Sequence, residues 1–75
     1  MKLFNNTSDE VMYTISSSTS DNCGNIDPGQ TADEPFFDNM TGVTVGFSTN
    51  SGDPFKVIIP ETTTGMTVTV GLYFE

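Results

Sequence analysis

Few residues in this chain are equipped for catalysis. The chain contains no histidine, the side chain that most often transfers protons near neutral pH, and a single cysteine, Cys23. No basic residue or histidine lies near Cys23 in the sequence to activate its thiol. A pair of carboxylates could in principle hydrolyse glycosides, but 75 residues offer little room for the required cleft. We therefore expect a protein that is not an enzyme, and a Cys23 thiol that is dispensable.

Acidic and amide side chains gather in two stretches, 21–27 and 33–39, which the sequence predicts to be loops. Calcium takes about six to eight oxygen ligands, often from such loops. The spacing does not match an EF-hand. The alternative interpretation is that Asp and Asn residues favour turns and solvate them. The candidate ligands for Ca²⁺, the one cofactor considered, are Asp21, Asn25, Asp27, Asp33 and Asp38.

The adjacent pair Phe36-Phe37 is the most unusual local feature. Neighbouring residues of a strand point to opposite faces, so both rings cannot enter a core from one strand. In a loop, both could fold beneath the open end of a β-sandwich, and we favour this arrangement. Otherwise, one ring is exposed and can enter a partner's pocket as an anchor. The candidate residues for partner contact are Phe36, Phe37 and Tyr73.

Alternation of apolar and polar residues dominates the chain and predicts strands with one face in a core. The runs at 11–16, 43–48, 55–59 and 66–74 show it, and most of their apolar residues are β-branched or aromatic, as strands favour. The predicted inward residues are Val11, Tyr13, Ile15, Val43, Val45, Phe47, Phe55, Val57, Ile59, Met66, Val68, Val70, Leu72 and Phe74.

Turn-forming residues separate these runs. The 27–30 stretch, Asp-Pro-Gly-Gln, fits a type II turn, Pro60 is expected to end a strand, and 62–65 supply a further turn. The 31–34 stretch resembles a helix capping box, but Pro35 disfavours a helical Glu34, so only one short turn is expected there. The pattern predicts a single all-β domain over residues 1–75, a small antiparallel β-sandwich or barrel of about six to seven short strands without substantial helix.

The charge balance restricts the partners. Lys2 and Lys56 are the only basic residues against ten acidic ones, which gives a formal net charge of −8. Such a chain repels nucleic acid and anionic lipid, because both are recognised through lysine and arginine. The expected partners are basic or neutral protein surfaces and copies of the chain itself. No run approaches the length of a transmembrane segment or a signal peptide, so we expect a cytoplasmic protein or one released without a recognisable signal.

Three hypotheses for the function follow. The first is a non-enzymatic structural or interaction domain that self-assembles into a homo-oligomer through its sheet edges, because lysine and proline, which guard natural edges, are scarce. The run 66–74 is the favoured edge, and the strand containing Lys2 to Asn5 and the strand containing Lys56 are the alternatives. The second is a calcium- or carbohydrate-binding module that uses the acidic loops 21–27 and 33–39. The third is an acidic inhibitor that mimics a polyanion.

Overall fold

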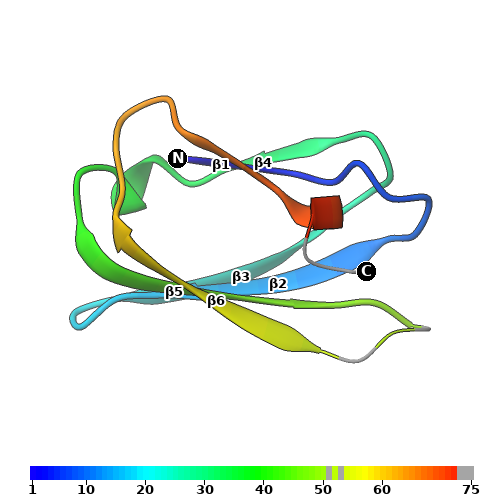
Figure 1. The fold of residues 1–75 in the computed structure, drawn as a ribbon, viewed down its shortest axis with the longest axis horizontal. Helices are drawn as coiled ribbons and strands as arrows, with labels where there is room; N and C mark the ends of the chain where they lie inside the picture. The colour runs from blue at the N-terminus through cyan, green and yellow to red at the C-terminus, as the bar shows by residue number, and fades with distance from the viewer. Residues whose placement is uncertain (51, 53, 73–75) are drawn as a thin grey trace.

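In the computed structural model, which describes residues 1–50, 52 and 54–72, the chain forms two β-sheets that pack face to face (Figure 1). The larger sheet is antiparallel and has the strand order β3-β2-β5-β6. Its strands are β2 (Val11–Ser16), β3 (Asp21–Ile26), β5 (Thr41–Ser48) and β6 (Phe55–Glu61). The fold is therefore the small all-β sandwich that the sequence predicts.

The smaller sheet has the order β4-β1-β7, with β1 (Lys2–Phe4) between β4 (Thr31–Asp33) and β7 (Thr67–Thr69). β1 runs antiparallel to β4 but parallel to β7. The parallel pair is a departure from the expected antiparallel arrangement. None of the helical segments in the described residues has the length and apolar character needed to cross a bilayer.

The core lies between the two sheets and contains the side chains that the alternation selected. Val11, Tyr13, Ile15, Val43, Val45, Phe47, Ile59, Val68 and Val70 are buried, and Phe55, Val57 and Met66 pack partly buried against them. The prediction is confirmed for these residues. The side chain of Leu72 and all of Phe74 lie outside the described part of the chain. The periodicity did not select Met1, Leu3, Ile26 and Phe37, which are also buried.

Residues 21–26 form a strand, so the prediction of a loop there is wrong. β3 pairs with β2 along its whole length, from Val11 opposite Ile26 to Ser16 opposite Asp21. The ring of Tyr13 lies against the backbone of Gly24, where an added Cβ would be only 2.9 Å from the ring. Because β3 has only Ile26 as a large apolar residue facing inward, its conformation is imposed by the neighbouring strand rather than by its own alternation.

Two strand ends in the C-terminal part of the chain differ from the prediction. Pro60 does not end its strand: β6 continues to Glu61, because an edge strand tolerates a residue without an N–H. Conversely, β7 ends at Thr69, and the 3₁₀ helix η2 (Val70–Leu72) follows. The Gly71 N–H donates to the side-chain Oδ1 of Asn6 at 2.7 Å, and this bond diverts it from a strand ladder.

The turns are closer to expectation. Gln30 N–H donates to the Asp27 carbonyl at 3.0 Å and Gly29 has a φ of 77°, as a type II turn requires. The 31–34 stretch does not cap a helix, since residues 31–33 form β4 and pair with β1. Glu34 is non-helical, as the following proline predicts, and the single 3₁₀ turn η1 (Pro35–Phe37) comes after it.

Candidate functional site

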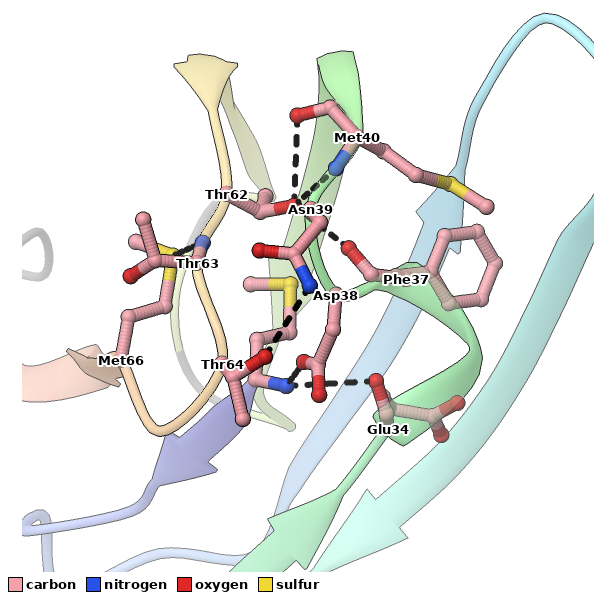
Figure 2. A network of polar contacts seen from close by, with 10 residues as sticks. Glu34, Phe37, Asp38, Asn39, Met40, Thr62, Thr63, Thr64 and Met66 are labelled. Atoms are coloured by element: carbon pink, nitrogen blue, oxygen red, sulfur yellow. Dashed lines mark hydrogen bonds and ion pairs between the residues drawn. The ribbon is translucent and has the colours of Figure 1, made fainter.

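One end of the sandwich is closed by the segments 34–40 and 62–66, which polar contacts join (Figure 2). Thr62 is buried, donates from Oγ1 to the Phe37 carbonyl at 2.5 Å and accepts from the Met40 N–H at 2.9 Å. The Thr62 N–H also donates to the Met40 carbonyl at 2.8 Å. The Met1 amino group forms an ion pair with Asp38 at the same end. These contacts hold the Phe36-Phe37 turn in one position.

The two phenylalanines of this turn have opposite environments. Phe37 is 1% exposed and packs in the core, whereas Phe36 is 62% exposed. Their rings meet edge to face with centroids 5.5 Å apart. The expectation that both rings fold under the sandwich is thus wrong for Phe36. Partner contact stays a prediction for Phe36, while the ring of Phe37 is buried and offers a partner no surface in this structure. Tyr73 lies outside the described residues.

The proposed calcium ligands are spread over the surface. Asp21 and Asn25 are exposed on β3, Asp27 lies in the turn that follows, Asp33 ends β4, and Asp38 pairs with the Met1 amine. Within the described ranges, no three acidic, cysteine or histidine side chains converge on a point that could hold a metal ion. Calcium binding remains a prediction, and the described residues do not bring the proposed ligands together.

A polar cluster around the buried Glu34, which the sequence did not reveal, joins β2, β3 and the residue after β4. Glu34 is 7% exposed, and its carboxylate accepts hydrogen bonds from the Tyr13 hydroxyl and, at 3.1 and 3.2 Å, from Asn22 Nδ2. The cluster is fully satisfied, as buried polar groups must be to avoid a desolvation cost. Burial, the hydrogen bond to Glu34 and the charge of that carboxylate all raise the pKa of Tyr13. The cluster links the larger sheet to the residue that follows β4 of the smaller sheet.

Tyr13 is expected to make the folded domain labile in alkali. Its folded-state pKa is raised above the ordinary value of 10.0, so only the unfolded chain loses this proton when the pH first passes 10.0. The stabilising contribution is complete below that pH and declines as the pH rises further. Urea midpoints measured between about pH 8 and pH 11.5 should fall more steeply for the wild type than for Tyr13→Phe. Equal slopes for the two proteins would contradict this assignment.

The sheet edges are a further surface that can bind a partner, through the unpaired N–H and C=O groups of their backbone. β1 is central in its sheet, so the hypothesis of an edge at Lys2 to Asn5 is wrong. β7 is an edge but contains three residues, as does β4. The edges of the larger sheet are longer: β3 has six residues, which are mostly polar, and β6 has seven, Phe-Lys-Val-Ile-Ile-Pro-Glu. We therefore take β6, the strand containing Lys56, as the candidate interaction site.

A shallow hollow of about 500 Å³ lies beside this strand on the outer face of the larger sheet. Its floor is the backbone around Gly46, and outward-facing side chains of β2, β5 and β6 form its walls. A second, smaller hollow lies over the β2–β3 end of the same sheet and includes Cys23.

Comparison with models of protein families, with curated proteins and with solved structures gave no match to this chain.

Proposed function

We propose that this protein is a non-enzymatic interaction domain that pairs with a second copy of itself through the open edge of β6. The observation that carries the proposal is Ile58, which is 71% exposed, more than any other large hydrophobic side chain among the described residues. It lies in the middle of the longest edge strand. An open edge presents unpaired N–H and C=O groups, and a second strand satisfies them while covering the apolar side chain.

The charge distribution favours this edge over the β3 edge. Each copy carries a net charge of −8, so two copies repel one another over most of their surface. The charged residues of β6 are Lys56 and Glu61, which cancel. The β3 edge and its turn carry Asp21 and Asp27 with no cation, so pairing there would bring like charges together. Approach along β6 therefore meets less repulsion than approach along β3.

The geometry supports a closed dimer rather than a fibre. A two-fold axis perpendicular to the sheet sets β6 antiparallel to its copy and joins two four-stranded sheets into one of eight strands. With the axis near Ile58, the two Ile58 side chains lie next to each other on the same face. Such pairing occupies the open β6 edge of each copy, so no β6 edge remains for a third copy. Pro60 and Lys56 disfavour pairing in a longer or shifted register.

The apparent mass of the wild type in sedimentation equilibrium is expected to rise from 8.1 kDa toward twice that value as the concentration increases. Dimer formation should be stronger at higher salt, because salt screens the repulsion between the two copies. Ile58→Lys should keep the fold, because the side chain is exposed, and should stay at 8.1 kDa. Phe36→Lys is the matched control: it places the same charge on an exposed apolar position at the end of the sandwich and should dimerise like the wild type.

The contact area of a single edge strand is small, so a weak, concentration-dependent dimer is the expected form. Sedimentation equilibrium up to about 1 mM covers that range. A wild type that remains at 8.1 kDa there, at low and high salt, would refute the proposal. Equal dissociation of both variants would show that pairing depends on charge in general and not on β6.

A further inference from the structure

Gly46 lies on the outer face of the larger sheet, beside the hollow. It stands in β5 between Thr14 of β2 and Lys56 of β6, which are its register partners. A Cβ placed at this glycine would lie 2.8 Å from Thr14 Oγ1 and 3.7 Å from Lys56 Cγ. A larger residue at this position would therefore force the Thr14 side chain to move. Gly46 lies among the residues that line the hollow of about 500 Å³.

The walls of the hollow combine apolar surface with one cation. Met12 is 45% exposed at its rim, and Pro54 contributes a second apolar surface. Thr14 and Ser48 supply hydroxyl groups, and Lys56 supplies an aliphatic stem and an ammonium group. In the described part of the chain, the one ion pair joins Met1 to Asp38, so Lys56 has no carboxylate partner there.

We infer that this hollow is a binding site for a small aromatic carboxylate, whose ring covers Gly46 between Met12 and Pro54 and whose carboxylate meets Lys56. The ring matches the apolar walls, and the carboxylate matches the cation that the chain leaves unpaired among its described residues. At physiological salt the screening length is about 8 Å, so charges beyond that distance act only weakly on a ligand beside Lys56. The inference does not rest on dimer formation, because hydrogen bonds at a sheet edge lie in the plane of the sheet and the hollow extends from β6 across β5 to β2, away from that edge.

The probes for the test are 2-naphthoate and, as its neutral counterpart, 2-naphthylmethanol, each titrated into ¹⁵N-labelled protein. Naphthoate should shift the amide signals of the residues around the hollow, with a dissociation constant in roughly the millimolar range for so open a site. Lys56→Met should weaken naphthoate binding by about fivefold and leave the alcohol unchanged. Lys2→Met removes the other lysine of the chain, which lies on the smaller sheet, and should change the affinity for neither probe.

A second variant tests the shape of the site. Gly46→Ala should weaken both probes, because the added methyl group occupies the floor of the hollow beside Thr14. Shifts that cluster elsewhere, or equal losses from Lys56→Met and Lys2→Met, would overturn the inference. Equal affinity of the wild type for the two probes would overturn the role of the carboxylate. If Gly46→Ala does not fold, the pair of lysine variants still decides the matter.

Discussion

Replacing Val45 with aspartate is expected to leave the domain unfolded at 25 °C. Val45 is 0% exposed in β5, a central strand, between Ile15 and Val57. A carboxylate there would be buried without a partner, at a cost of several kcal/mol. The whole free energy of unfolding of a domain this size is on the order of 5 to 10 kcal/mol. Circular dichroism and the dispersion of amide NMR signals would report the loss of the fold.

The neighbouring residue provides the control. Thr44 points to the outer face of the same strand and is half-buried. Thr44→Asp adds the same charge one position away and should retain the fold, with a change in the free energy of unfolding within about 1 kcal/mol. If Val45→Asp folds and Thr44→Asp does not, the two faces of the larger sheet have been assigned the wrong way round.

The second large effect concerns the phenylalanine pair. Phe37→Ala is expected to lower the free energy of unfolding by about 3 to 5 kcal/mol, because it removes a ring that is 1% exposed and leaves a cavity at the end of the core. Phe36→Ala should cost less than about 0.5 kcal/mol, because that ring is already 62% exposed. Urea unfolding of both variants measures the difference. Similar losses would mean that the two rings share the burial.

The same pair shows where prediction from the sequence stops. Two adjacent phenylalanines show that a strand cannot bury both rings, but which one is buried depends on the 3₁₀ turn after Pro35 and on its bonds to Thr62, 25 residues away from Phe37. The strands β2 and β5 could be predicted because their own alternation is strong. β3 could not, because it has little apolar surface of its own and follows its neighbour.

Buried polar residues were the hardest to predict. Asn5 is 0% exposed and donates from Nδ2 to the carbonyls of Asp9 and Ile26, both at 2.8 Å. Glu34 and Thr62 are likewise buried with partners distant in the sequence. Composition predicts all three to be exposed, and only the tertiary fold supplies the hydrogen bonds that make burial affordable. No local pattern encodes those partners.

The candidate sites divide in the same way. The sequence predicts the strand with Lys56 as one alternative edge, but which strands are edges depends on pairing between distant segments. The favoured strand at 66–74 is short in the structure, where β7 has three residues. The hollow does have a local signal in the sequence. A glycine inside an alternating strand, as at Gly46, marks a close approach or a missing side chain.

Amide hydrogen exchange, followed residue by residue as a function of protein concentration, tests the pairing of β6 most directly. We predict that the β6 amides that point away from β5 exchange a few-fold more slowly at about 1 mM than at about 20 µM, because the second copy protects the fraction of chains that is paired. The amides at the open edge of β3 should exchange at the same rate in both samples. Protection that appears at β3 or β7 instead, or β6 exchange that does not depend on concentration, would contradict the account.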